Sequence, residues 1–249
     1  MAPRHARTFT LAAAIVLGLC TNSIAAGKGR SSRAIRYDPA RYGPEIPLTE
    51  IVRDSSLQLD DNGHLVGARL EIVKSAYELR LSCGERHIKT YRIQLGKAPK
   101  GAKSRRGDFK TPEGSYTICH HNGGSRYYLS LQIDYPNEDD IVRGLEEKVV
   151  TTAEADRLRA ERAAGGCPAL RTRLGGDIFI HGQHPGVTRD IEREGRKSSP
   201  RKDLRAGDQD PGSMTDGYNW TLGCIGMTNP DIRELFGALP DGTPVEILQ

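Results

Sequence analysis

Residues 69–95, RLEIVKSAYELRLSCGERHIKTYRIQL, set the fold class of this chain. Apolar and polar side chains alternate over residues 77–81 and again over residues 91–95, the period-two pattern of a strand with one buried face. The tetrad at residues 82–85, SCGE, is turn-like and lies between these runs, which predicts a hairpin. A further strand is expected at residues 69–73. The stretch therefore indicates a mostly β domain.

More strands and a few helices are expected around this hairpin. The further strands lie at four places: 116–119, 127–133, 177–180 and 244–248. Residues 137–164 are helical in character, because Thr151 and Glu154 fit a capping box and Gly165 can end the helix. A last helix is expected from Asn229, which would be the cap, with a proline at the first helical position.

The composition excludes several classes of protein. Of 249 residues, 37% are hydrophobic and 27% charged, which excludes a disordered tail, a collagen-like fibre and a polytopic membrane protein. The formal net charge of +4 falls to +2 without Arg4 and Arg7, which lie in a segment we expect to be removed. This charge gives no support to a nucleic-acid partner.

Residues 1–26 are expected to form a signal peptide. A basic start precedes an apolar run at residues 9–20 that is too short to span a bilayer, and small residues follow it. A lipoprotein is disfavoured because Leu19 precedes Cys20, where a small residue is preferred. We expect an exported, periplasmic or otherwise extracytoplasmic protein with no membrane span after cleavage. Residues 27–65, basic and interrupted by prolines, would be a lead-in segment.

Three clusters hold residues suited to chemistry: GDFKTPEGSY at 107–116, IFIHG at 178–182 and WTLGCIGMT at 220–228. Each alone fits a structural role, as a rigid turn, a satisfied histidine or a small cysteine in a glycine turn. Together they indicate a cysteine nucleophile, because a thiol becomes a strong nucleophile when a histidine takes its proton. The glycines beside Cys224 also expose amides that can hold an oxyanion.

In this order, the GDxxTPEGxY turn, the strand ending in His-Gly and the later Gly-Cys before a helix resemble the L,D-transpeptidase catalytic domain, also called the YkuD domain. The resemblance runs over residues 66–249 and implies a single β-sandwich domain, with a helical insertion at 137–176 and a polar loop at 186–212. It implies that Cys224 is the nucleophile, that His181 is the general base and acid, and that the Gly182 carbonyl orients His181. Supporting roles fall on the amides of Gly223 and Cys224 as oxyanion donors, and on Trp220, Thr221 and Gly226 as substrate-binding residues. No metal or cofactor is implied.

The segment around Cys224 departs from the family pattern. Many members have S-H-G-C, then an apolar residue and Arg or Asn, whereas this chain has TLGCIG. Leu222 stands in place of the second histidine. Gly226 stands in place of the Arg or Asn that helps to hold the substrate or the thiolate.

The resemblance implies a cell-wall enzyme. Cys224 would attack the carbonyl between the third residue and the terminal D-alanine of a peptidoglycan stem tetrapeptide, giving a thioester. An amine from a second stem would then form a 3→3 cross-link, or water would release the product of an L,D-carboxypeptidase. No residue separates these two outcomes.

Two readings from other classes stay open. A metal-dependent peptidase would draw on the histidines and Cys224, although zinc sites usually show tighter ligand spacing; the candidates are His120, His121, His181 and His184. A non-catalytic wall-binding protein would use the basic loop at residues 189–205, for which a solvated surface insertion is the simpler interpretation.

The resemblance also bears on the remaining cysteines. If Cys224 stays a thiol, only Cys83, Cys119 and Cys167 can pair, and we expect the disulfide Cys119–Cys167. Residues 137–164 and 186–212 flank His181 in the sequence, so both are expected to border the cleft that holds Cys224.

Overall fold

The structure is a computed structural model that describes residues 46–168, 172–183 and 219–249. These residues all belong to one compact unit. The expected signal peptide, residues 27–45 of the lead-in, His184 and the whole polar loop at 186–212 lie outside the described residues.

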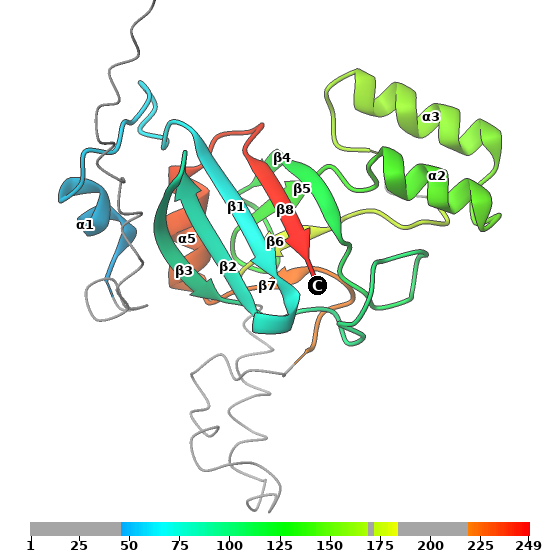
Figure 1. The fold of residues 1–249 in the computed structure, drawn as a ribbon, viewed down its shortest axis with the longest axis horizontal. Helices are drawn as coiled ribbons and strands as arrows, with labels where there is room; N and C mark the ends of the chain where they lie inside the picture. Colours follow the sequence, from blue (N-terminus) through cyan, green and yellow to red (C-terminus); the bar gives the residue numbers. More distant parts are fainter. Residues whose placement is uncertain (1–45, 169–171, 184–218) are drawn as a thin grey trace, which may run out of the picture. The chain divides into compact units, whose positions relative to one another are not determined.

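Eight strands form one continuous sheet in the order β3-β2-β1-β8-β4-β5-β6-β7 (Figure 1). The strands are β1 Ala68–Val73, β2 Glu78–Cys83, β3 Arg86–Arg92, β4 Gly114–Asn122, β5 Ser130–Ile133, β6 Phe179–His181, β7 Ile225–Gly226 and β8 Pro244–Leu248. The helices are α1 Leu48–Arg53, the short 3-10 helix η1 Lys74–Ala76, α2 Glu138–Glu146, α3 Thr152–Ala163 and α5 Asn229–Ala238. The predicted mostly β class with a few helices is confirmed.

The hairpin expected from the opening stretch is β2 paired antiparallel with β3. Leu79 and Leu81 are fully buried, as the alternating pattern requires. The second strand of the hairpin, β3, spans Arg86–Arg92, so it begins and ends earlier than the predicted 91–95. Gln94 instead leaves the hairpin and makes an isolated bridge with Gly226.

Strand β4 joins the two halves of the sheet. Residues 114–117 pair with β8, and the rest of the strand pairs with β5, with a register shift between Ile118 and His120. The sheet therefore curls at β4 instead of splitting into two separate sheets. Beyond it, β6 pairs antiparallel with β5 and parallel with β7, which sets His181 opposite Gly226.

Helix α5 begins one residue earlier than the sequence suggested. The cap is Thr228, whose extended backbone precedes the helix and whose Oγ1 accepts a hydrogen bond from the Asp231 amide at 3.2 Å. Asn229 is wrong as the cap because it is already helical. Its side-chain oxygen accepts instead from the Gln183 amide at 2.8 Å, which ties α5 to the segment after β6.

The described part of the lead-in packs on the sheet. Leu48 and Ile51 of α1 are buried in the main core cluster. Beside them, the Lys89 ammonium donates to Glu234 of α5 at 2.7 Å. The same two side chains bind the lead-in: Lys89 Nζ donates to the Ile46 carbonyl at 2.8 Å, and Glu234 accepts from the Leu48 amide at 3.0 Å.

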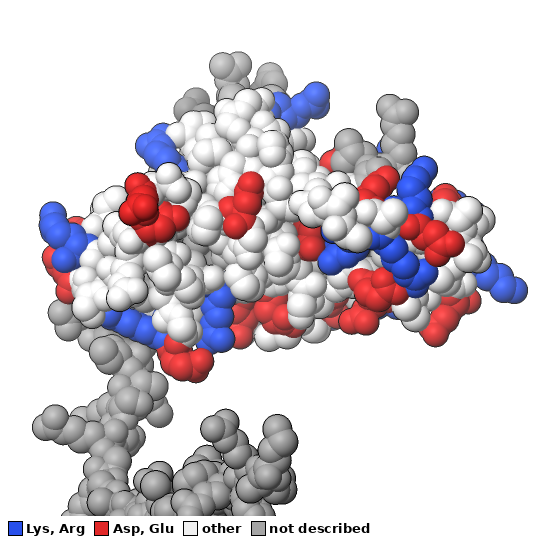
Figure 2. Space-filling view, turned by 90° about the horizontal axis from the view of Figure 1, so that it is seen from above, with Lys and Arg blue, Asp and Glu red and all other residues white. Residues whose placement is uncertain are grey.

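Helices α2 and α3 form the insertion, which lies beside the sheet in Figure 1. They have a small core of their own. Both begin with capping boxes, one of them the predicted Thr151–Glu154 pair. In Figure 2, Lys and Arg lie beside Asp and Glu over the right-hand side of the view. One ion pair of the insertion joins Arg159 to Glu138 at 2.6 Å. No helix in the described residues is long and apolar enough to cross a bilayer.

A disulfide ties the insertion to the sheet. It joins Cys119 of β4 to Cys167, which follows α3, with an S–S distance of 2.00 Å. The free cysteines within the described residues are Cys83 and Cys224. The pairing in the structure is thus the one expected from the sequence.

Removing this disulfide is expected to destabilise the domain. The bond closes a loop with a sequence separation of 48 residues, so the Cys119→Ser/Cys167→Ser variant should lose about 4 kcal/mol of unfolding free energy by the loop-closure relation. Urea unfolding under non-reducing conditions measures this loss. Cys83→Ser is the control and should unfold within about 1 kcal/mol of the wild type. Equal midpoints for all three proteins would contradict the prediction.

Candidate active site

Cys224 lies at the end of a tight turn, directly before β7. Thr221 Oγ1 donates to the Cys224 carbonyl at 2.7 Å and closes this turn. Gly223 has a φ of +135°, and a Cβ placed there would lie 2.7 Å from the Lys110 carbonyl oxygen. The residue before the cysteine must therefore be glycine for both conformational and steric reasons.

The two amides expected to hold an oxyanion differ in this turn. The Gly223 amide donates to Thr221 Oγ1 at 3.2 Å, so it is already engaged in this state, and its role as an oxyanion donor stays a prediction. Within the described residues, no hydrogen bond is recorded for the Cys224 amide. The available donor is therefore the amide of Cys224 itself.

His181 ends β6 and is buried, with 3% of its surface exposed. Its Nδ1 donates to the Gly182 carbonyl at 2.7 Å, which leaves Nε2 as an acceptor. The ring lies between Tyr127 and Trp220, at centroid distances of 4.6 and 5.5 Å. Burial lowers the pKa of His181, and the hydrogen bond to Gly182 opposes this. At neutral pH the imidazole is therefore uncharged and ready to accept a proton.

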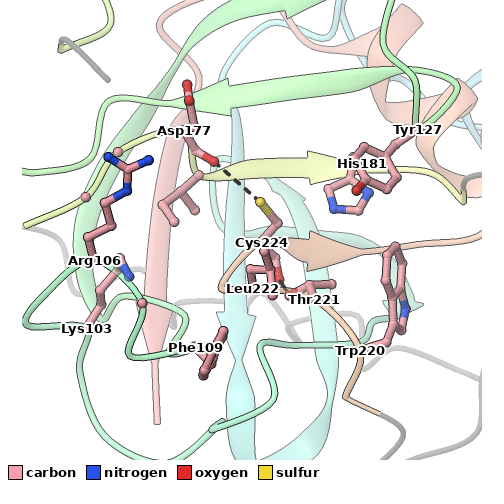
Figure 3. A pocket seen from close by; sticks show the side chains of 14 residues that line it. Lys103, Arg106, Phe109, Tyr127, Asp177, His181, Trp220, Thr221, Leu222 and Cys224 are labelled. Atoms are coloured by element: carbon pink, nitrogen blue, oxygen red, sulfur yellow. Dashed lines mark hydrogen bonds between the residues drawn. The ribbon is translucent and has the colours of Figure 1, made fainter. Parts of the chain in front are cut away.

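Two cavities meet at Cys224 and His181. The first has a volume of about 390 Å³ and the second about 520 Å³, and Tyr127, His181 and Cys224 line both. In Figure 3 the Cys224 sulfur is turned toward Asp177, while His181 lies on the other side against Tyr127. Both cavities are therefore open to the thiol and to the imidazole.

The Cys224 thiol is protonated in this arrangement. Sγ donates to the Asp177 carbonyl at 3.4 Å. Burial raises the pKa of Cys224 to about 11; a backbone hydrogen bond at Phe179 lowers it, the Asp177 charge raises it, and the positive charge of Lys103 lowers it. Forming the thiolate near neutral pH therefore requires a base.

The GDFKTPEG turn forms one wall of the first cavity. Asp108 accepts hydrogen bonds from Lys103 Nζ at 2.7 Å and from the amides of Ser104 and Lys110. This holds the loop so that Arg106 and Phe109 line the cavity. Phe109 is 41% exposed and has a left-handed φ of 57°.

Sequence reasoning missed three charged residues of this wall, Lys103, Arg106 and Asp177. The sequence pattern predicts a rigid turn at residues 107–116 and the start of a strand at Asp177. Nothing in either pattern shows that the two segments face each other across one cavity.

Trp220 packs on Gly226 in β7. The indole lies over Gly226, where a Cβ would come within 3.2 Å of Trp220 Cζ2, and its Nε1 donates to Gln94. Gly226 pairs with Gln94 through its N–H and its carbonyl and lines neither cavity, and its role in substrate binding stays a prediction. Trp220 and Thr221 do line the first cavity.

The helical insertion does not border the two cavities. None of residues 137–164 lines either one, and the wall is formed instead by Gly175, Gly176 and Asp177 after it. The expectation for 137–164 is therefore wrong: α2 and α3 pack on Leu174, and only the chain beyond it returns to the site.

The other histidines considered as metal ligands lie elsewhere. His121 Nδ1 is 2.7 Å from Asp241 Oδ1, and its ring packs edge-on against Phe236. In the part of the chain that the structure describes, no three His, Cys, Asp or Glu side chains are grouped to hold a metal ion.

Gly182 is fitted tightly beside His181, so Gly182→Ala is expected to disturb both stability and the site. Its methyl group would lie 2.5 Å from Asn229 Oδ1 and 3.0 Å from the Tyr127 carbonyl oxygen. We expect a loss of about 1–3 kcal/mol in unfolding free energy and slower acylation, because the carbonyl that holds His181 moves. Urea unfolding and acylation kinetics measure the two effects.

Gly237→Ala in α5 is the matched control, since a Cβ there meets no atom within 4 Å. It should stabilise the helix by about 0.5–1 kcal/mol. Equal behaviour of the two variants would show that the space around Gly182 is not limiting.

The fold and these residues together define a curled, mostly β domain with a cysteine and a histidine in shared cavities. The model of the family described as the L,D-transpeptidase catalytic domain (YkuD) matches residues 67–247, so the chain belongs to this family. The family acts on the peptides of peptidoglycan.

Relatives and solved structures resemble the chain more distantly. The "Putative L,D-transpeptidase YafK" of Escherichia coli (strain K12) is 30% identical over 106 residues, which is 41% of each chain. The helical cell shape determining protein Pgp2 from Campylobacter jejuni is 21% identical, with a TM-score of 0.43 over 80% of this chain and 53% of that one. Mycobacterium tuberculosis L,D-transpeptidase 1 is 11% identical, with a TM-score of 0.35 over 74% and 62%. The chain spans about half the length of the first two.

Proposed function

We propose that this protein is an exported L,D-transpeptidase that acts on peptidoglycan stem tetrapeptides through a thioester on Cys224. The observation that carries the proposal is the shared lining of the two cavities by Cys224 and His181. The hydrogen bond from His181 Nδ1 to Gly182 supports it, because it leaves Nε2 as a base. Family membership supplies the class of substrate.

Acylation begins when the Cys224 sulfur turns from the Asp177 carbonyl toward the imidazole. His181 Nε2 takes the thiol proton, and the sulfur attacks the carbonyl that links the third residue to the terminal D-alanine. The Cys224 amide stabilises the oxyanion of the tetrahedral intermediate. The imidazolium then gives its proton to the D-alanine nitrogen as the C–N bond breaks, which leaves a thioester and free D-alanine.

Deacylation reverses the proton path. The amine of a second stem peptide attacks the thioester carbonyl, His181 takes a proton from that amine, and the thiol leaves protonated. The product is a 3→3 cross-link. Two cavities that meet at the same sulfur suit two peptides, a donor and an acceptor, better than one peptide and water.

Incubation of the protein with disaccharide-tetrapeptide tests this proposal. Mass spectrometry should find a dimer formed with loss of one alanine, together with free D-alanine. A disaccharide-tripeptide as the main product would identify an L,D-carboxypeptidase on the same site. Unchanged substrate, and no adduct between Cys224 and a penem, would overturn the proposal in favour of a wall-binding protein.

A further inference from the structure

Asn229 lies in the first turn of α5, and its side chain reaches the segment that follows β6. The side-chain oxygen Oδ1 accepts a hydrogen bond from the Gln183 amide at 2.8 Å. The helix does not need this side chain as its cap, because Thr228 Oγ1 already accepts from the Asp231 amide. The Asn229 side chain is therefore available for a contact outside its own helix.

The Gln183 amide and the carbonyl that holds His181 belong to one peptide group. This group joins Gly182 to Gln183, and its oxygen accepts from His181 Nδ1 at 2.7 Å. The N–H and the C=O of a trans peptide point in opposite directions. Asn229 and His181 thus bind opposite ends of the same planar group. Two hydrogen bonds in series link the Asn229 side chain to the imidazole.

Main-chain contacts hold the preceding peptide group, between His181 and Gly182. Its N–H donates to the Leu129 carbonyl at 3.1 Å, and its carbonyl accepts from the Met227 amide at 2.8 Å. The following group, which carries the Gly182 carbonyl, is bound instead by a side chain, that of Asn229. The direction of the carbonyl that orients the base therefore depends on this side chain.

The contact between this peptide group and α5 is close. A Cβ on Gly182 would lie 2.5 Å from Asn229 Oδ1 and 3.1 Å from Cγ2 of Ile232, which is fully buried in the same helix. Such distances leave no room for a water molecule between Gly182 and Asn229. The peptide group thus packs directly on the first turn of α5.

One short stretch of chain carries both the nucleophile and Asn229. Cys224 directly precedes β7, and Asn229 begins the helix that follows this strand. Strand β7 pairs with β6, which sets His181 opposite Gly226. The stretch therefore positions the thiol and, through Asn229, the peptide group that orients the imidazole.

Hydrogen bonds in series polarise one another. The bond from the Gln183 N–H to Asn229 makes the Gly182 oxygen a stronger acceptor for His181 Nδ1. The proton then stays on Nδ1, and Nε2 remains the acceptor that faces the thiol. An apolar side chain at position 229 would remove both this polarisation and the restraint on the plane of the peptide.

We propose that Asn229 is a positioning residue for acylation, which acts through the peptide group between Gly182 and Gln183 to fix the tautomer and the orientation of His181. This role rests on the proposed function, in which His181 is the base for the Cys224 thiol. Asn229 lines neither cavity, so it acts on the reaction through the histidine.

Two substitutions of Asn229 test the role in the full chain. NMR of histidine labelled at both ring nitrogens reports which nitrogen carries the proton, and comparison with His181→Ala assigns the His181 signals. Asn229→Leu removes the acceptor at similar volume. It should give a mixture of tautomers and acylation by a penem that is about 10- to 100-fold slower. Asn229→Asp keeps an oxygen at the same place and should restore the Nδ1–H tautomer and most of the rate.

Thr228→Ala is the matched control, because it removes the cap of the same helix and leaves the bond between Asn229 and Gln183 in place. It should unfold at a lower urea concentration and keep the wild-type tautomer and acylation rate. If Asn229→Leu does not fold, Asn229→Ala takes its place, since alanine favours the helix, and the same results are expected.

Four results would overturn the positioning role. They are a single Nδ1–H tautomer without the Asn229 acceptor, mixed tautomers at an unchanged rate, equal loss of the tautomer in Thr228→Ala, and an Asn229→Asp protein that behaves like Asn229→Leu. Failure of the proposed function has a different signature. The wild type would then form no acyl-enzyme, while the tautomer of His181 would still respond to Asn229 as expected and support the hydrogen-bond link.

Discussion

Cys224→Ser is expected to abolish acyl-enzyme formation, with a loss of roughly 10³-fold or more in the rate of acylation. The serine hydroxyl is far less acidic than a thiol, and its environment opposes the charge further, since burial already raises the pKa of Cys224 to about 11. The imidazole is positioned for a thiol and cannot activate the hydroxyl to the same extent. Intact-protein mass spectrometry after mixing with a penem or with disaccharide-tetrapeptide measures the adduct.

The second free thiol of the described residues provides the control for this experiment. Cys83 lies at the end of β2, away from both cavities, and burial raises its pKa. Cys83→Ser should acylate at the wild-type rate and to the same mass. An adduct that persists in Cys224→Ser and disappears in Cys83→Ser would show that the nucleophile has been assigned to the wrong cysteine.

The sheet was largely predictable because its strands follow local patterns. Alternation in β1 and β2 and the turn at residues 84–85 depend only on neighbouring side chains. Errors occurred where a distant segment competes for the same backbone. Gln94 leaves the hairpin to pair with Gly226, and Asn229 gives up the helix cap to bind the Gln183 amide.

The site was predictable in its centre and not at its walls. Cys224 and His181 lie 43 positions apart, and the resemblance to a family placed them together without any knowledge of the sheet. Their juxtaposition depends on the parallel pairing of β6 with β7, which sets His181 beside the strand that Cys224 precedes. Arg106 and Asp177 have no such motif, since a charge on a turn usually faces solvent. Only the curled sheet shows that they share a cavity.

The TLGCIG segment shows how a departure from a family pattern can be absorbed by packing. Gly226 removes a long polar side chain, and the Trp220 indole lies over it and against the edge of the His181 ring. The imidazole is therefore confined by aromatic rings on two sides and by the Gly182 carbonyl. One tautomer and one orientation result. In that orientation His181 lines both cavities.

His181→Ala is expected to lower the acylation rate by roughly 10² to 10⁴ near neutral pH, because the thiol then loses its base. The pH profile separates this role from a structural one. Burial lowers the pKa of His181, so the wild-type rate should rise with pH only below about 6.5 and then stay level. The variant must instead ionise its thiol directly. Since the pKa of Cys224 is about 11, its rate should climb tenfold per pH unit through the neutral range.

His121→Ala provides the comparison, because this histidine pairs with Asp241 and lines neither cavity. It should keep both the rate and the flat profile. Added imidazole should partly restore the His181→Ala rate, since the deletion leaves a space of the right size between Tyr127 and Trp220. A His181→Ala profile that is lower than wild type but equally flat would mean that the ring only supports the fold. The steep rise is expected because burial raises the pKa of the thiol and lowers the pKa of the imidazole. Near neutral pH the thiolate therefore forms only as its proton passes to His181.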